Sequence, residues 1–336
     1  MEKFPSIDQF RHCVKRVQRK AEFTCMDAEG QPMYDHLAIK PKLRFRGYVK
    51  LHGTNAGIVF SDQPTVFQSR ERELTAESDN AGFYAHMTAN TPSMADLRIK
   101  IAATFGYKSK VAVYGEWCGR GIQKGVGISE LEKMFIIFAI AADDEWMDIE
   151  LIGDYHSHDA NIYTISAFAK YDVLIDFENP SEAQNEMVKI TEAVELCCPV
   201  AQALGAKGIG EGVVWHCVEP GMESSDYWFK VKGEKHSESH VKTLSAVDIE
   251  LANSVAEFVA RTVTTQRLEH ALQNLTNEQQ KPFEMQSIGD FLRWVFNDIL
   301  KEESDTITAS GIDSKKLGGP ISIAAKRWFI ERLNIA

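Results

Sequence analysis

Short runs of apolar, β-branched and aromatic residues alternate with polar turns along the first two-thirds of the chain. Runs of this kind, bounded by turn residues, are typical of β-strands. They predict strands over 36–60, with a polar loop at 50–55, and over 110–116, 134–140, 212–215 and 227–232. Residues 181–204 have a helical pattern, and Ser6-Ile7-Asp8 resembles the cap of a helix that follows it.

The pattern changes after about residue 245. Apolar residues then repeat at helical spacing, most clearly at Ile288, Phe291, Leu292 and Val295. A second helical face contains Leu251, Val255, Phe258, Val259 and Val263, and residues 320–334 form a third helical segment with Pro320 near its start. We therefore expect an α+β protein, with a first domain of antiparallel sheets flanked by helices over 1–243 and a small all-helical domain over 244–336.

Charge is distributed unevenly. The formal net charge of the 336 residues is −11, which taken alone argues against a nucleic-acid partner. Residues 1–50, however, carry 11 Lys/Arg against 6 Asp/Glu, whereas residues 143–195 carry 2 against 14. The acidity is concentrated in one segment, so the N-terminal region is free to face phosphate. Two ordinary solvated surfaces would explain the same pattern equally well.

Cysteine usage and hydropathy indicate a cytoplasmic protein, in the host cell if the source is viral. The six cysteines form no C-x-x-C pair, which fits reduced thiols better than disulfides or a zinc site. There is no run of 18 apolar residues and no apolar stretch of the secretory type at the start, so we expect no membrane span.

One ordered set of residues carries candidate chemistry. It begins with Lys50 in the segment K-L-H-G-T-N, and Glu116, Phe138, Glu211, Lys230 and Lys232 follow in that order. Lys230 and Lys232 are two apart on a predicted strand and so share one face. Taken singly, Phe138 suits a core, Glu116 a strand end and Lys232 a solvated surface. Together they supply a nucleophile, two carboxylates, an aromatic ring and two further cations.

Such a set suits nucleotidyl transfer. A lysine must lose its proton before it can attack phosphorus, and neighbouring cations and partial burial favour that loss. The phosphates need cations and a divalent metal to disperse charge. Glu211 could hold Mg²⁺, which prefers carboxylate and phosphate oxygens. Phe138 could stack on a purine, and Glu116 could accept hydrogen bonds from ribose hydroxyls.

The ordered set resembles that of the covalent nucleotidyltransferases, namely ATP-dependent DNA ligases, RNA ligases and mRNA capping enzymes, which share K-x-D-G. With His52 at the acidic position, this chain is similar to the double-strand-specific (type 2) RNA ligases of bacteriophages and to trypanosome RNA-editing ligases. Residues 115–123, G-E-W-C-G-R-G-I-Q, resemble the G-E-x-x-G-x-G-I-Q of that group. The likeness extends over nearly the whole chain and is looser in the helical C-terminal region.

The resemblance implies an ATP-grasp-like adenylyltransferase domain over 1–243 and a helical RNA-binding domain over 244–336. It implies an ATP-dependent RNA ligase that seals 3′-hydroxyl and 5′-phosphate ends through lysyl-AMP and RNA-adenylate intermediates. The cofactors would be ATP, whose AMP becomes bound to Lys50, and Mg²⁺ or Mn²⁺. The partner would be nicked duplex RNA or an RNA/DNA hybrid, and the protein would act as a monomer.

The resemblance also implies residue roles. Lys50 would accept AMP, Glu211 would serve the metal, and Lys230 and Lys232 would contact the phosphates. The nucleotide site would further be lined by Leu51, His52, Thr54, Asn55, Arg70, Glu116 and Phe138. Glu116 would contact the ribose and Phe138 the adenine. Arg70, or the nearby Arg72, would match the family arginine near the ribose and the activated phosphate. Two departures stand out, because relatives carry Asp after the Phe, where this chain has Ala139, and often a basic residue at the position of His216.

Other interpretations remain open. An ATP-dependent DNA ligase or a capping-type nucleotidyltransferase would share the core set, but both usually add a β-barrel where this chain has a helical tail. A non-catalytic RNA-binding repair protein would have no use for Lys50. In the tail, the candidates for RNA contact are Lys315, Lys316, Lys326 and Arg327.

Three further features carry less weight. His156 and His158 would share a face of a strand, and His236 and His240 have helical spacing, but neither pair has further ligands. The glycines at 205, 208, 210 and 212 precede a strand, which is the wrong context for a phosphate-binding loop.

Overall fold

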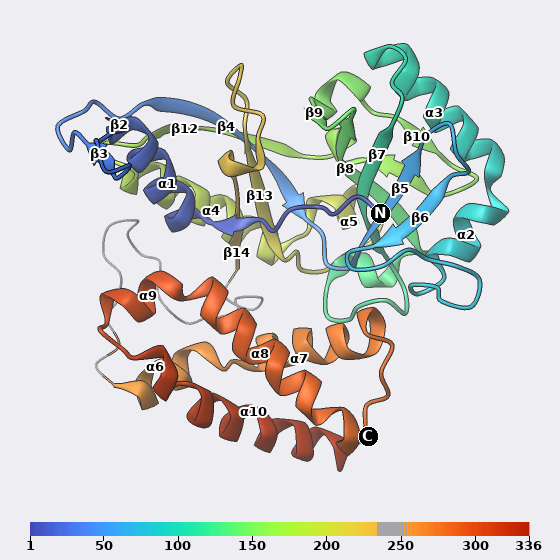
Figure 1. The fold of residues 1–336 in the computed structure, drawn as a ribbon. Helices are drawn as coiled ribbons and strands as arrows, with labels where there is room; N and C mark the ends of the chain where they lie inside the picture. The colour runs from blue at the N-terminus through green and yellow to red at the C-terminus, as the bar shows by residue number, and fades with distance from the viewer. Residues whose placement is uncertain (234–251, 253, 336) are drawn as a thin grey trace. The chain divides into compact units, whose positions relative to one another are not determined.

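The chain divides into two compact units, Met1–Lys235 and His236–Ala336. The computed structural model describes residues 1–233, 252 and 254–335 (Figure 1). The predicted domain boundary at 243/244, together with His236, His240 and Leu251, lies outside the described residues.

A five-stranded sheet forms one half of the first unit, in the order β1-β14-β13-β4-β12. Its strands are β1 (Asp8–Gln9), β4 (Lys42–Lys50), β12 (Lys170–Asp176), β13 (Gly212–Cys217) and β14 (Trp228–Lys232). Neighbours are antiparallel except β1 and β14, which are parallel. The helices α1 (Phe10–Glu22) and α4 (Ser181–Leu196) pack against this sheet. The Phe229 ring, buried on β14, lies 4.9 Å from that of Phe10 on α1 and 5.3 Å from that of Phe45 on β4.

A seven-stranded sheet forms the other half, in the order β10-β11-β8-β7-β5-β6, with β9 paired to β8. Its strands are β5 (Thr54–Phe60), β6 (Val66–Ser69), β7 (Val111–Cys118), β8 (Met134–Ala142), β9 (Glu145–Met147), β10 (His156–Ser157) and β11 (Ile162–Thr164). Here too one pair, β11 with β8, is parallel. The helix α2 (Phe83–Ala89), which precedes α3 (Thr91–Phe105), places the ring of Phe83 5.5 Å from Trp117 and 5.0 Å from Phe135.

An aromatic cluster joins the two sheets. Phe4, Tyr114 of β7 and Trp228 of β14 are buried together with small residues of β5, β7 and β8, and Phe138 packs against them. The two sheets are therefore held at a fixed separation by large rings.

The first unit is completed by the hairpin of β2 (Phe23–Met26) and β3 (Pro32–Tyr34) and by the short helix α5 (Pro199–Ala203).

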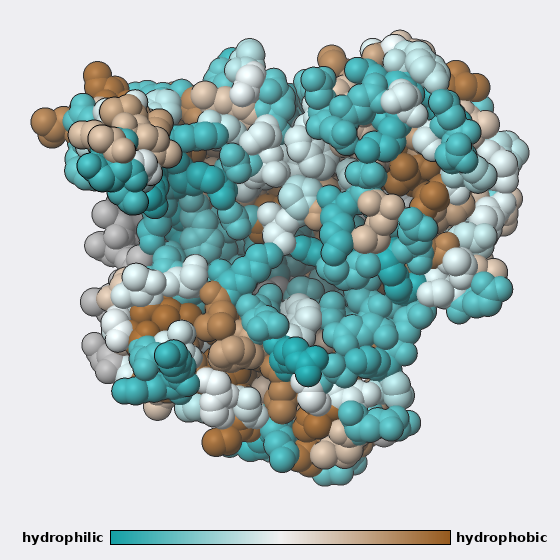
Figure 2. Space-filling view, in the orientation of Figure 1, coloured by the Kyte–Doolittle hydropathy of each residue, from teal (hydrophilic) through white to brown (hydrophobic). Residues whose placement is uncertain are grey.

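The second unit is helical. It contains α6 (Val255–Thr262), α7 (Thr265–Gln273), α8 (Ile288–Glu302), α9 (Ser304–Ala309) and α10 (Gly318–Leu333). Helices α8 and α10 pack through Phe291 and Phe329, whose ring centroids are 4.8 Å apart. Ser254 and Thr264 cap α6 and α7 by accepting backbone N–H bonds. Hydrophobic residues also reach the surface of this unit (Figure 2), and Ile323 is 72% exposed.

The predicted α+β class is confirmed, with sheets of mainly antiparallel strands followed by helices. The predicted helix over 181–204 is in two parts, because the chain is extended at Cys197 and Cys198 before Pro199. The predicted cap at Ser6-Ile7-Asp8 is wrong. Asp8 lies in β1 opposite Phe229, and α1 begins at Phe10 without a side-chain cap. None of the described helices is long and apolar enough to cross a membrane.

The helical unit contains a buried charge cluster that makes a testable contribution to stability. Arg267 is fully buried; its Nε donates to Asp298 Oδ2 at 2.8 Å, and its guanidinium lies 3.6 Å from Glu303, which is also fully buried. We predict that Arg267→Met lowers the free energy of unfolding by about 3–5 kcal/mol, because two carboxylates lose their buried counter-charge.

Urea unfolding followed by circular dichroism measures this loss. The matched control is Arg261→Met, which breaks an i,i+4 pair with Glu257 near the surface and should cost less than about 1 kcal/mol. Equal losses in the two variants would contradict the prediction.

Candidate active site

Strand register brings two lysines beside one glycine. Gly212 of β13 pairs with Lys50 of β4 on one side and with Lys232 of β14 on the other. Residues that pair directly point to the same face of a sheet, so Lys50 and Lys232 share a face. At Gly212 φ is +155°, and a Cβ would lie 2.2 Å from the carbonyl oxygen of Val231. Glycine is therefore required at the point where the three strands meet.

The carboxylate of Glu211 lies among these cations. Its Oε1 is 2.7 Å from Lys50 Nζ and 3.3 Å from Lys232 Nζ, and its Oε2 is 3.2 Å from Nδ1 of His52. Glu211 is only 3% exposed. Burial alone raises the pKa of this carboxyl, but Lys50, Lys232 and His52 outweigh burial and hold the pKa well below its usual range. Glu211 is therefore an ionised, buried carboxylate at neutral pH.

The loop after Lys50 is fixed against the second sheet. The backbone N–H of Gly53 donates to Glu116 Oε1 at 2.9 Å, and Gln123 Nε2 donates to the Gly53 carbonyl at 3.1 Å. Asn80 Nδ2 donates to Thr54 Oγ1 at 3.1 Å. A Cβ at Gly53 would lie 2.4 Å from the carbonyl oxygen of Trp117, so the loop approaches β7 too closely for any side chain there.

Glu116 brings a second carboxyl from β7 into this group. Burial raises its pKa to about 7; the charge of Lys50 and the hydrogen bond from Gly53 oppose the rise, and the charge of Glu211 adds to it. The two carboxyls therefore differ in protonation near neutral pH, since Glu211 is ionised while Glu116 titrates. Asn55 pairs directly with Glu116 across β5 and β7, which places it on the same face.

The remaining predicted residues lie on β14 or just after the ends of β4 and β6. Lys230 is on the face of β14 that carries Lys232, opposite Val214. Leu51 is buried, 6% exposed. Arg70 donates to Ser6 Oγ at 3.0 Å, whereas Arg72 donates to the carbonyls of Ser78 and Asp79. Arg72 thus holds a loop, which supports Arg70 as the member of the pair that serves the site.

Phe138 lies at a β-bulge. Tyr114 pairs with Ala139 and Gly115 with Ile137, so Phe138 is the extra residue of β8. Ala139, at the position where relatives carry Asp, is buried opposite Tyr114 in the aromatic cluster. His216 stacks on Trp228 with ring centroids 4.5 Å apart and planes 13° apart, and burial lowers its pKa to about 4. Neither Ala139 nor His216 therefore supplies a charge at neutral pH. A charged side chain at either position would lie beside aromatic rings, where burial of a charge is costly.

Gln123, Asn80 and the Gly53 N–H have no role in the prediction from sequence. Gln123 is the last residue of the segment that resembles G-E-x-x-G-x-G-I-Q, but the sequence does not indicate that its side chain contacts Gly53. Asn80 carries no comparable signal, because it reaches Thr54 from a loop 26 positions away.

A family model described as RNA ligase matches residues 45–232, which is more than half of the chain. The matched range includes Glu211 and its partners Lys50, His52 and Lys232, which together we call the Glu211 cluster. The chain belongs to the RNA ligase family.

Solved structures give a more distant likeness. An RNA ligase of Naegleria gruberi with pyrophosphate is 15% identical with a TM-score of 0.44, and the match covers 70% of this chain and 56% of that one. A mutant with AMP and Mn gives 13% identity, a TM-score of 0.45 and the same coverages. A mutant with ATP and Mn gives 14% identity and a TM-score of 0.45, and the match covers 70% of this chain and 57% of that one. This chain thus spans little more than half of those proteins. No curated protein matches it.

Among the described residues, no group of three or more His, Cys, Asp or Glu side chains could hold an ion. His156 and His158 contact each other through their rings, with centroids 4.3 Å apart. An ion at Glu211 would need most of its ligands from elsewhere, which fits Mg²⁺ carried by nucleotide phosphates.

The raised pKa of Glu116 predicts a pH-dependent effect on stability. The folded-state pKa, about 7, lies above the ordinary value of 4.5, so the native state binds the proton more tightly than the unfolded chain does. The stability from this group is complete below pH 4.5 and is lost as the pH rises through 7. Relative to Glu116→Gln, which cannot ionise, the wild type should lose about 2 kcal/mol between pH 5 and 8.

Urea unfolding of both proteins at pH 5, 6, 7 and 8 measures the difference. Glu145→Gln, at an exposed carboxyl of β9, is the control and should run parallel to the wild type. A constant gap between the wild type and Glu116→Gln over this range would show that Glu116 does not titrate there.

Proposed function

We propose that this RNA ligase is ATP-dependent and transfers AMP to Lys50. The observation that supports this most strongly is the contact of Lys50, Lys232 and His52 with one buried carboxylate, Glu211, on residues that the sequence pattern had singled out in order. A surface lysine has no need of such a site.

In the first step Nζ of Lys50 attacks the α-phosphorus of ATP. The lysine first gives up its proton to water. A P–N bond then forms, the bond from the α-phosphorus to the bridging oxygen breaks, and pyrophosphate leaves with the electron pair of that bond. Glu211 is a poor acceptor for that proton because its pKa is held so low. We assign Glu211 to placing Lys50 and Lys232, and Lys230 and Lys232 to the charge on the phosphates.

The nucleoside part of ATP would lie along the second sheet. Glu116 accepts hydrogen bonds from ribose hydroxyls, Asn55, Leu51 and His52 line the site, and Phe138 stacks on adenine. Arg70 serves the ribose and the activated phosphate. Mg²⁺ or Mn²⁺, when bound with the phosphates, would neutralise developing charge, with Glu211 as the protein carboxylate nearest to Lys50.

The later steps join RNA. AMP passes from Lys50 to a 5′-phosphate, and a 3′-hydroxyl then attacks that phosphate and releases AMP. As in the type 2 ligases that the sequence resembles, the substrate is a nick in duplex RNA or in an RNA/DNA hybrid, and the protein acts as a cytoplasmic monomer. Lys315, Lys316, Lys326 and Arg327 of the helical unit are all exposed, which supports their contact with a duplex backbone.

Covalent labelling tests the first step. Incubation with α-labelled ATP and Mg²⁺ should label the wild type and leave Lys50→Ala unlabelled, because Nζ of Lys50 is the proposed nucleophile. EDTA should abolish labelling in the wild type. Lys189→Ala, at an exposed lysine on α4, controls for the loss of one positive charge and should label normally.

Two outcomes of the labelling experiment would contradict the proposal. A wild type that stays unlabelled would favour a non-catalytic RNA-binding protein. Labelling from α-labelled GTP in preference to ATP would favour a capping-type enzyme.

Substrate preference tests the later steps. We predict faster sealing of a nicked RNA duplex than of single-stranded RNA or a nicked DNA duplex, by about tenfold or more, since an A-form duplex offers 2′-hydroxyl and backbone contacts along its minor groove. Initial rates with pre-adenylated enzyme isolate the sealing steps from the first. Faster sealing of nicked DNA would identify a DNA ligase.

A further inference from the structure

A segment at the start of the chain crosses the face of the molecule where the two sheets meet. We call residues 2–9 the N-terminal strap. In Figure 1 it is the dark blue trace that runs past β5 and β7 and ends as β1 beside β14. The proposed reaction gives this segment no task, yet it touches strands of both sheets.

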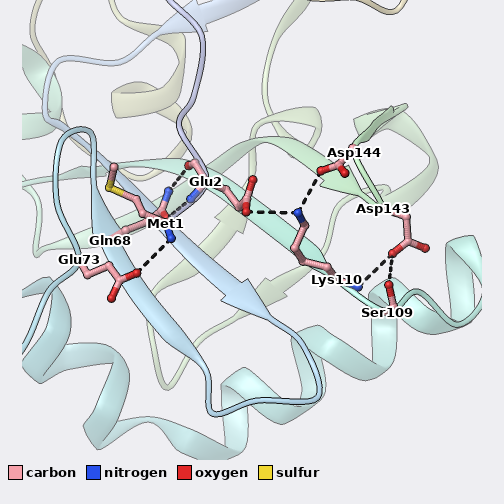
Figure 3. A network of polar contacts seen from close by, with 8 residues as sticks. All are labelled: Met1, Glu2, Gln68, Glu73, Ser109, Lys110, Asp143 and Asp144. Atoms are coloured by element: carbon pink, nitrogen blue, oxygen red, sulfur yellow. Dashed lines mark hydrogen bonds and ion pairs between the residues drawn. The ribbon is translucent and has the colours of Figure 1, made fainter.

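The first part of the strap is tied to the seven-stranded sheet (Figure 3). Gln68 on β6, which is 2% exposed, accepts from the backbone N–H of Glu2 at 2.9 Å and donates to its carbonyl. The carboxylate of Glu2 lies 3.2 Å from Lys110 Nζ, which is also 3.0 Å from Asp144. A buried amide that satisfies both backbone groups of one residue fixes that residue in place.

Phe4 then enters the aromatic cluster between the sheets. Its ring centroid is 5.0 Å from that of Phe138 in an edge arrangement, 5.2 Å from Tyr114 and 5.8 Å from Trp228. Phe4 is only 9% exposed. It thus bridges the ring proposed to stack on adenine and the strand that carries Lys230 and Lys232.

The end of the strap reaches two more proposed nucleotide contacts. Arg70 donates to the hydroxyl of Ser6 at 3.0 Å. Gln9 pairs with Lys230, which extends the five-stranded sheet by one short parallel strand. Within eight residues the strap therefore contacts Phe138 on β8, Arg70 directly after β6 and Lys230 on β14.

We propose that Phe4 is a positioning residue for nucleobase binding: it holds the Phe138 ring at the angle that stacks on the adenine of ATP. Phe138 lies at a bulge, where ladder pairing does not fix the side chain, so its neighbours determine its orientation. Edge packing on Phe4 supplies that constraint. This inference depends on the proposed function, because adenine stacking on Phe138 is part of it.

The test is Phe4→Leu, which keeps apolar volume and removes the ring. The initial rate of enzyme adenylylation, measured against ATP concentration, should show KM raised about three- to tenfold and kcat within about twofold, as expected when one aromatic pair no longer orders the stacking ring. Phe4→Tyr keeps the ring, and its KM for ATP should equal that of the wild type. Ile7→Ala, in the same strap and cluster, is the matched control and should leave KM unchanged.

A second readout separates positioning from general loosening. In the reverse reaction pyrophosphate, which has no base, removes AMP from Lys50, and KM for pyrophosphate should be the same in Phe4→Leu and the wild type. An unchanged KM for ATP, or an equal rise for ATP and pyrophosphate, would overturn the inference. If Phe4→Leu does not fold, Phe4→Met answers the same question. Failure of the wild type to take up AMP would instead refute the proposed function.

Discussion

A buried carboxylate surrounded by cations is the constraint on which the rest of this site depends. An ion such as Glu211 costs several kcal/mol to bury unless charged partners surround it. Lys50 and Lys232 provide that charge only because Gly212 pairs with both of them at once. A one-residue slip of either neighbouring strand would turn one lysine to the opposite face and take one of the two ammonium groups away from Glu211. The register of β4, β13 and β14 and the chemistry of the site are therefore a single requirement.

The second constraint is the short connection between the sheets. β4 ends at Lys50 in one sheet and β5 begins at Thr54 in the other, so three residues make the crossing. Gly53 makes it possible by lying against the backbone of β7, and Glu116 and Gln123 hold it through its N–H and carbonyl. The position of Lys50 thus depends on both sheets, and the aromatic cluster that joins them is part of the support of the site.

Much of this arrangement was predictable because it is encoded locally. The strand β8 is a continuous apolar run, β7 is apolar except at Gly115 and Glu116, and α8 has a clear helical stripe. The order of Lys50, Glu116, Glu211 and Lys232 indicated a nucleotide site, and the structure brings these four into one group. The helix α3 gave no such signal, because its apolar residues are not confined to one face: Leu97 and Ile101 are buried, whereas Ile99 is 66% exposed.

Other features depend on distant partners and could not be predicted. β1 has two residues, too few for a period, and forms because β14 offers it an edge. The contacts of Asn80 with Thr54 and of Phe4 with Phe138 join segments whose separation no spacing rule relates. The boundary between the domains stays a prediction from sequence.

The Glu211 cluster also has a consequence for turnover. The carboxylate already occupies the anion position between Lys50 and Lys232, so an incoming triphosphate competes with an anion that belongs to the protein itself. In the proposed reaction, the same carboxylate would reclaim Lys232 from the departing pyrophosphate once AMP has been transferred. A pocket of free lysines would retain such a product tightly, whereas a competing anion within the protein would weaken product inhibition and let the proposed reaction continue to the RNA end.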